Sequence, residues 1–115
     1  IRSCDALLKK SDFPKALFLT SSVAFKPKPF WGGYSVSKAA LNHMIKLWAL
    51  ENTHTRFSIC TIEPGNTQTK LRKKAMPGEE INSLQQPVMV AKSIIKLIFL
   101  DTVYKGETIK LSNIY

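Results

Sequence analysis

The chain contains few cysteines, few glycines and few acidic residues, and each shortage argues against a class of protein. Its two cysteines, Cys4 and Cys60, lack the spacing of a metal site or a disulfide framework, so we expect buried free thiols, no metal and a cytoplasmic location. Its five glycines include no glycine-rich dinucleotide-binding turn. The apolar runs are too short to span a bilayer, so we expect no membrane partner.

Basic residues outnumber acidic ones by 17 to 8, which gives a formal net charge of +9. The segment 70–74 is almost entirely basic and could attract anionic substrates or the phosphates of a cofactor. A charge of this size also suggests nucleic-acid binding as an alternative. The chain has neither zinc-ligand spacing nor the aromatic motif of RNA-binding domains, so we expect no nucleic-acid partner.

Apolar patterns typical of strands and helices alternate along the chain. This alternation is typical of an α/β fold, in which right-handed crossovers place parallel strands side by side and helices flank the sheet. One helix is apolar over much of its surface, so Leu41, Ile45 and Trp48 face either the protein core or a second subunit. We predict strands at 16–20, 57–62 and 108–111, and helices at 1–10, 34–51 and 87–100.

A tyrosine and a lysine, Tyr34 and Lys38, lie four residues apart at the start of the 34–51 helix. Side chains at this spacing share one helix face, so the ammonium group can favour loss of the phenol's proton. Such a pair is suited to acid–base chemistry on an alcohol or a carbonyl. Trp31, just before the helix, either lines a substrate site or packs on its own helix.

Two further motifs follow the first two predicted strands. Ser21 and Ser22 come directly after the 16–20 strand, and a Pro-Gly turn at 64–69 comes after the 57–62 strand. In an open α/β sheet, the carboxyl ends of the strands face the ligand crevice. Gly65 would let the backbone approach a ligand closely. Each motif alone is also what an ordinary strand end or loop contains, and their order along the chain is the stronger signal.

The chain resembles the short-chain dehydrogenase/reductase family, whose serine, Tyr-x-x-x-Lys and Pro-Gly motifs occur in this order and at about these spacings. The resemblance runs from about Leu7 to the end of the chain. It implies the carboxyl-terminal part of a doubly wound, Rossmann-type parallel sheet with flanking helices. The segments that carry it are Leu-Thr-Ser-Ser-Val-Ala at 19–24, Trp-Gly-Gly-Tyr-Ser-Val-Ser-Lys-Ala-Ala-Leu at 31–41, Glu-Pro-Gly-Asn-Thr-Gln-Thr at 63–69 and Lys-Gly-Glu-Thr-Ile-Lys-Leu at 105–111.

The resemblance also implies roles for individual residues. Tyr34 would be the general acid or base, Lys38 would stabilise the tyrosinate and bind the nicotinamide ribose, and Ser21 would hold the substrate oxygen. Ser22, one residue nearer to Tyr34, is the alternative serine. The predicted catalytic residues are therefore Ser21, Tyr34 and Lys38, and the predicted cofactor-binding residues are Tyr34, Lys38, Pro64, Gly65, Thr67 and Thr69.

Members of the family are about twice this length, so residues 1–115 would form one partial NAD(P)-binding domain that lacks the amino-terminal dinucleotide-binding half. The implied function is NAD(P)-dependent interconversion of a small-molecule carbonyl and alcohol, with NADP preferred over NAD. The resemblance also implies a homo-oligomer formed through the 34–51 helix. The alternative is an inactive fragment, with doubtful cofactor binding, that acts at most as a dimerisation module.

Overall fold

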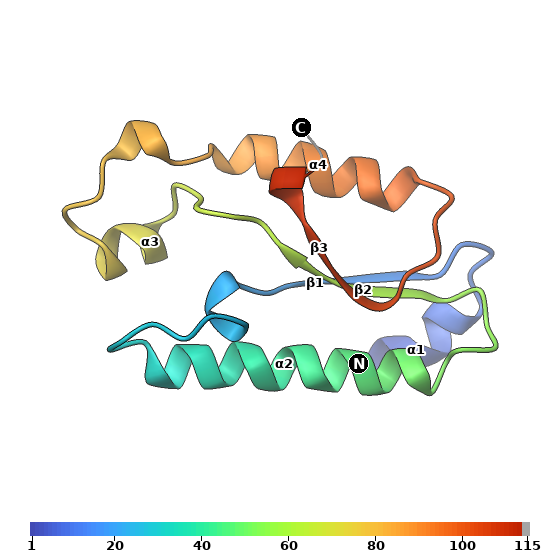
Figure 1. Cartoon of the computed structure of the whole chain (residues 1–115). Helices are drawn as coiled ribbons and strands as arrows, with labels where there is room; N and C mark the ends of the chain where they lie inside the picture. The colour runs from blue at the N-terminus through green and yellow to red at the C-terminus, as the bar shows by residue number, and fades with distance from the viewer. Residues whose placement is uncertain (114–115) are drawn as a thin grey trace.

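The computed structural model describes residues 1–113, which form a three-stranded parallel sheet with helices on both faces (Figure 1). The strand order is β1-β2-β3, so each strand lies beside the next one in the sequence. The predicted α/β fold with adjacent parallel strands is confirmed. The helices and strands are α1 (Arg2–Lys9), β1 (Lys15–Leu19), α2 (Gly32–Leu50), β2 (Ser58–Glu63), α3 (Lys70–Ala75), α4 (Pro87–Phe99) and β3 (Lys105–Lys110).

The core has two parts, one on each face of the sheet. On one face, α2 packs against the sheet through a cluster that includes Ile45, Phe57 and Ile59. On the other face, a cluster that includes Ile62 and Leu97 joins the sheet to α4. Figure 1 shows α2 and α4 on opposite sides of the sheet, with α1 beside the end of α2. The central strand β2 is therefore buried from both sides along almost its whole length, including its polar residues Ser58 and Thr61.

The observed boundaries differ from the predicted ones most clearly at β3 and α3. Strand β3 begins at Lys105, three residues before the predicted start, because Lys105 already pairs with Ile59 of β2 ahead of an irregularity in the pairing. In that irregular part of the strand, Gly106 adopts φ +95° and the chain passes close to α2. A Cβ atom at Gly106 would lie 3.2 Å from the Lys46 Cα and the Ala49 Cβ. Helix α3 was not predicted. In the sequence, its residues stand out only as a basic run.

Helix α2 faces its own sheet with the three residues for which contact with a second subunit was the alternative. Ile45 and Trp48 are buried in the cluster between α2 and the sheet, and Leu41 is partly buried against it. Of the two alternatives, packing in the core holds for these three residues. A second row of apolar residues on α2 stays exposed, and its large members are Val36, Met44, Leu47 and Leu50.

The two cysteines lie in different environments. Cys60 is a buried free thiol in β2, and its burial raises its pKa to about 12, so it stays protonated. Cys4 is exposed, and the prediction of a buried thiol is wrong there. Helix α1 contacts the core through Leu8, and the part of its apolar stripe that carries Cys4 and Leu7 faces solvent.

Within residues 1–113, no helix is both long enough and apolar enough to cross a membrane. The same part of the chain has no group of three or more histidine, cysteine, aspartate or glutamate side chains that could hold a metal ion.

Candidate functional site

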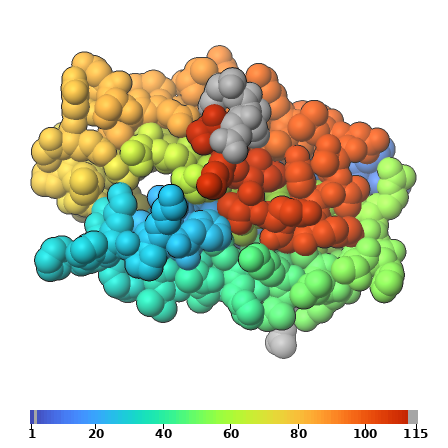
Figure 2. Space-filling model, viewed as in Figure 1, coloured from blue at the N-terminus to red at the C-terminus, as the bar shows by residue number. Residues whose placement is uncertain are grey.

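A cavity of about 640 Å³ lies at the carboxyl ends of β1 and β2. Figure 2 shows the hollow between the segment that follows β1, in blue to cyan, and the segment that follows β2, in yellow-green. Because both strands are parallel, the loops that leave them meet at this edge of the sheet. The cavity brings together all the site residues predicted from the sequence, namely Ser21, Tyr34, Lys38, Pro64, Gly65, Thr67 and Thr69, and Ser22 lines it as well.

The serine segment and the start of α2 are joined by a hydrogen bond. After β1 the chain forms a short 3₁₀ helix at Ser22–Ala24, and α2 begins at Gly32. The Ser35 hydroxyl donates to the backbone carbonyl of Val23 at 2.6 Å. Ser21 has an extended backbone and is half-buried, whereas Ser22 is exposed. Both serines are therefore fixed relative to the first turn of α2.

Lys38 is anchored to the end of β1 and lies beside Tyr34. Its ammonium group donates to the backbone carbonyl of Leu19 at 3.0 Å and lies 5.8 Å from the centre of the Tyr34 ring. An ammonium group has three N–H donors, so this anchor leaves two for other partners. Trp31 packs edge-on against the Tyr34 ring, with ring centres 5.8 Å apart, and it also lines the cavity. Packing of Trp31 on its own helix is therefore confirmed, and binding of a substrate beside Trp31 stays a prediction.

The turn after β2 requires a glycine at position 65. Gly65 adopts φ +78°, which side chains disfavour, and a Cβ atom there would lie 3.0 Å from the Gln85 Nε2. The backbone N–H of Gly65 donates to the Glu63 carboxylate at 3.2 Å. These contacts fix the path of the chain where it lines the cavity.

Gln85 holds the same turn from the far side and was missed by the sequence analysis. Its backbone N–H donates to the Asn66 carbonyl, and its carbonyl accepts from the Gln68 N–H, both at 2.9 Å. This parallel bridge pairs Gln85 with Thr67 and points the N–H and C=O of Thr67 away from Gln85. No signal near Gln85 in the sequence indicates this pairing, because it depends on how the chain returns after α3.

Thr69 begins helix α3 as its N-cap. Its hydroxyl oxygen accepts a hydrogen bond from the backbone N–H of Arg72 at 3.1 Å. The hydroxyl proton of Thr69 is not used by this contact, so it can be donated to a ligand. Thr69 therefore sets both the position of α3 and one wall of the cavity.

Within the basic segment 70–74, Leu71 and Arg72 line the cavity. The Arg72 guanidinium forms a two-pronged pair with the Glu79 carboxylate, with Nε to Oε2 at 2.6 Å. This contact raises the pKa of Arg72 and lowers that of Glu79. Much of the positive charge that Arg72 brings to the cavity is therefore neutralised, which weakens the expectation that this segment attracts anions. Pro77 and Gly78 between the partners are the sequence signal for the turn that returns Glu79 to α3.

We expect the Arg72–Glu79 pair to hold α3 in place at neutral pH. Because Arg72 lowers the pKa of Glu79 below its ordinary 4.5, the contribution is fully present above pH 4.5 and is lost as the pH falls through the lowered pKa. Glu79→Gln should increase hydrogen exchange of the α3 amides at pH 7, and Glu80→Gln, at an exposed neighbour, should not. Equal exchange in both variants would contradict a role for the pair.

The family model for the short chain dehydrogenase matches residues 3–80 of the chain. An uncharacterized oxidoreductase of Escherichia coli K12, YciK, is 36% identical over 81 residues, which is 70% of this chain and 32% of that protein. The benzil reductase IRC24 of Saccharomyces cerevisiae, described as (S)-benzoin forming, is 37% identical over 71 residues, 61% of this chain and 27% of that protein. The matched segments therefore cover between a quarter and a third of each of these relatives.

A solved structure from Shigella flexneri 2a has the same arrangement of helices and strands. It is a short chain dehydrogenase complexed with NADP, and it superposes with a TM-score of 0.83 at 29% identity. The superposition covers 96% of this chain and 46% of that one. The Rossmann-type fold predicted from the sequence is thus matched by a structure that contains it as one part of a longer chain.

Proposed function

Because the chain belongs to the short-chain dehydrogenase family, we propose that it carries the catalytic part of an NAD(P)-dependent oxidoreductase that interconverts a small-molecule carbonyl and an alcohol. The observation that supports this proposal best is the single cavity that holds Ser21, Tyr34 and Lys38 together with the turn 64–69. The proposal is also consistent with the names of two relatives, the oxidoreductase YciK and the benzil reductase IRC24.

In the proposed reduction, Tyr34 donates its phenolic proton to the carbonyl oxygen of the substrate, and in the reverse reaction it accepts the proton from the alcohol. The Ser21 hydroxyl donates a hydrogen bond to the same oxygen, so that negative charge develops against a fixed donor. Lys38, held by the Leu19 carbonyl, stabilises the phenolate that Tyr34 becomes after the transfer. Tyr34 thus transfers the proton, Ser21 positions the substrate oxygen that receives it, and Lys38 stabilises the charge left on Tyr34.

A nicotinamide cofactor, when bound, would supply or accept the hydride. Several features of the cavity fit its nicotinamide end. Lys38 and Tyr34 can donate to ribose hydroxyls, and the Thr69 hydroxyl and the backbone of Thr67 can hold the carboxamide. Pro64 and Gly65 line the cavity beside these groups, and the NADP in the Shigella flexneri structure favours NADP over NAD. The 115 residues contain no glycine-rich turn for the pyrophosphate, so only this end of the cofactor is fitted.

A fluorescence titration of the 115-residue chain with NADPH and NADH, after its intact mass has been checked, tests the proposal. Saturable binding, tighter for NADPH, would support a cofactor site in the chain. Absence of binding in a folded sample would contradict it and favour the alternative, a fragment that acts at most as a dimerisation module. Circular dichroism of the same sample shows whether it is folded.

The roles of the two serines can be separated by substitution. If Ser21 positions the substrate oxygen, Ser21→Ala should lower kcat by about 100-fold through loss of one oxyanion donor, and Ser22→Ala should have little effect. NADPH affinity should change little in either variant. The measurement is steady-state oxidation of NADPH with a saturating ketone, and a larger loss in Ser22→Ala would reassign the role to Ser22.

The exposed apolar row on α2 supports the proposed homo-oligomer. We expect Met44→Glu to place a charge in the middle of this row and to shift the protein from dimer to monomer, as measured by sedimentation velocity. Met89→Glu, at a methionine of α4 with nearly the same exposure as Met44, is the control and should leave the dimer intact. A parent chain that is already monomeric at micromolar concentration would contradict assembly through α2.

A further inference from the structure

Phe30, at the mouth of the cavity, combines two unfavourable features. Its backbone has φ +67°, and it is the only non-glycine residue among 1–113 with a positive φ. This region is rarely adopted by bulky side chains. Its side chain is fully exposed, at 106% of the reference area, so the ring gains nothing from burial. Phe30 nevertheless lies on the cavity wall, next to Trp31 in the sequence.

A strained backbone conformation of this kind persists only where the surrounding structure holds it, and such residues cluster at ligand sites. When an apolar group binds in a cavity, an exposed ring at its mouth can pack against that group and become buried, which is favourable. Phe30 is therefore better explained by a contact with a ligand than by the stability of the chain alone.

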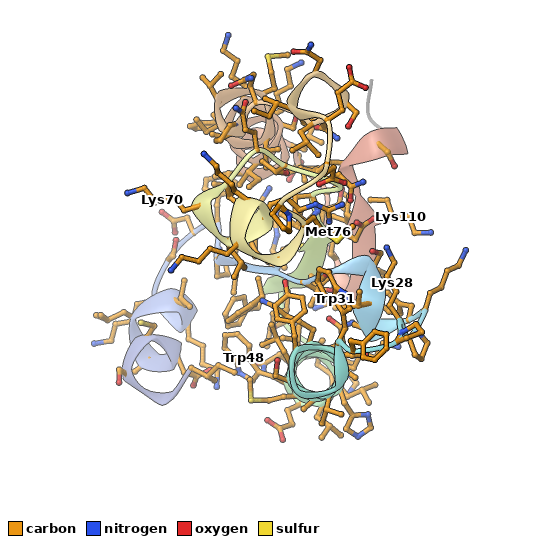
Figure 3. The ribbon with its side chains drawn as sticks, turned by 90° about the vertical axis from the view of Figure 1, so that its left-hand side faces the viewer. Lys28, Trp31, Trp48, Lys70, Met76 and Lys110 are labelled. Carbon is orange, nitrogen blue, oxygen red and sulfur yellow. The ribbon has the colours of Figure 1, made fainter. Side chains whose placement is uncertain are left out.

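The wall near Phe30 is apolar and partly aromatic. Trp31 packs edge-on against the Tyr34 ring, and Leu71 and Ala75 face the same cavity from α3. Figure 3 looks at the end of the molecule where α3 lies and shows Trp31 between α3 and the start of α2. A substrate whose carbonyl lies beside Tyr34 would therefore extend its remaining atoms along Trp31.

The charged groups on this wall are mostly satisfied by the chain itself. Arg72 is paired with Glu79, and the Glu63 carboxylate accepts from the Gly65 N–H. Lys38 donates to the Leu19 carbonyl. Lys28 is the cation on the wall with the fewest such contacts, and it would be the partner of an anionic substrate if one were bound.

We propose that Phe30 and Trp31 form an aromatic lip that binds an uncharged aryl group of the substrate and so makes the site selective for aryl ketones. This inference rests on the proposed carbonyl–alcohol function and names the substrate class of the same cavity. The aryl ring stacks on the lip, and its carbonyl lies next to the Tyr34 hydroxyl.

Three ketones of similar size separate the contributions of aromaticity and charge. Acetophenone is neutral and aromatic, cyclohexyl methyl ketone is neutral and saturated, and 4-acetylbenzoate is aromatic and anionic. Their affinities for the 115-residue chain can be measured without cofactor by quenching of tryptophan fluorescence, with a correction for ligand absorbance. We expect acetophenone to bind at least 10-fold more tightly than either of the other two ketones.

Phe30→Asn removes the ring and keeps the backbone, because asparagine tolerates positive φ. We expect this variant to unfold at a temperature at least as high as the parent and to bind acetophenone about 10-fold more weakly, a loss of about 1.4 kcal/mol. Its affinity for cyclohexyl methyl ketone should change little. Phe25→Asn is the matched control, because Phe25 is an exposed phenylalanine of the same segment with negative φ that does not line the cavity.

The inference is overturned if Phe30→Asn binds acetophenone as tightly as the parent, if none of the ketones binds, or if 4-acetylbenzoate binds most tightly, which would indicate a site for anions at Lys28. Oxidation of NADPH by the same ketones distinguishes this inference from the proposed function. Phe30-dependent binding of acetophenone without NADPH oxidation would contradict the function and support the lip. NADPH oxidation that is insensitive to Phe30→Asn would support the function and contradict the lip.

Discussion

Tyr34→Phe should lower kcat for reduction of a carbonyl substrate by about 10³-fold, within the range usual for loss of a positioned general acid. The substitution removes one oxygen atom and keeps the ring that packs against Trp31 and lies beside the Lys38 ammonium. The fold should therefore be unchanged, and NADPH affinity should fall only by the loss of one hydrogen bond to the ribose. The measurement is single-turnover oxidation of bound NADPH, which separates the chemical step from binding.

Tyr104→Phe is the matched control for this prediction. Tyr104 is a half-buried tyrosine that packs against the cluster beneath α4, outside the cavity wall. Removal of its hydroxyl should leave kcat within a factor of two of the parent. If Tyr34→Phe keeps more than a tenth of the parent's kcat, another group donates the proton and the proposed role of Tyr34 is wrong.

The alternation of strand and helix patterns was sufficient to predict the order and parallel direction of the strands. Parallel strands need crossover helices, and only a few topologies satisfy this rule with short connections. The exact ends of β3 could not be predicted, because they depend on the close approach of Gly106 to Lys46 and Ala49, far away in the sequence. The side of α2 that faces the sheet was equally open, because two rows of apolar residues lie next to each other on that helix.

The motifs were also sufficient to predict which residues lie together in the cavity. Each motif lies at the carboxyl end of a strand or at the start of the next helix, and these positions meet at one edge of the sheet. Their catalytic and binding roles remain predictions. What the sequence could not provide is the support around them, namely the Gln85 bridge to the turn and the Arg72–Glu79 pair. The Gln85 bridge joins segments whose relative position is set by folding and has no local pattern, whereas for the Arg72–Glu79 pair the sequence signals only the turn at Pro77 and Gly78 and not the pair itself.

The backbone of Phe30 is a further feature without a sequence signal. Lys-Pro-Phe-Trp-Gly-Gly predicts a loop, and the glycines at 32 and 33 would be the first choice for a positive φ. The structure places both glycines in the first turn of α2 and the unusual backbone at Phe30. This local departure from the expected pattern coincides with the cavity mouth, as is common at functional sites.

Trp48→Ala should lower the free energy of unfolding by about 3–5 kcal/mol, the usual cost of removing a large buried aromatic side chain. Trp48 lies edge-on to two other rings of the core, with ring centres 6.0 Å from Phe18 and 5.0 Å from Phe57. It thereby joins α2 to β1 and to the start of β2. Its indole N–H also donates to the Asp5 carboxylate at 3.2 Å, which ties α1 to the same cluster.

Urea unfolding followed by circular dichroism measures this effect, and two variants divide it into its parts. Trp48→Phe keeps most of the ring contacts and loses the bond to Asp5, so we expect a loss of about 1 kcal/mol. Leu47→Ala, at the exposed neighbouring position, should change stability by less than about 0.5 kcal/mol. A Trp48→Ala variant as stable as Leu47→Ala would contradict the assignment of Trp48 to the core.

The same substitution should also affect the cavity, although Trp48 does not line it. Lys38 and Trp48 lie on one rigid helix, about 15 Å apart at 1.5 Å per residue, so the packing of Trp48 fixes the position at which Lys38 reaches the Leu19 carbonyl. In Trp48→Phe, where the ring contacts remain, NADPH affinity should stay within twofold of the parent. In Trp48→Ala the loss of affinity should follow the fraction of unfolded protein measured in the same sample, because the site depends on the fold and not on the indole itself.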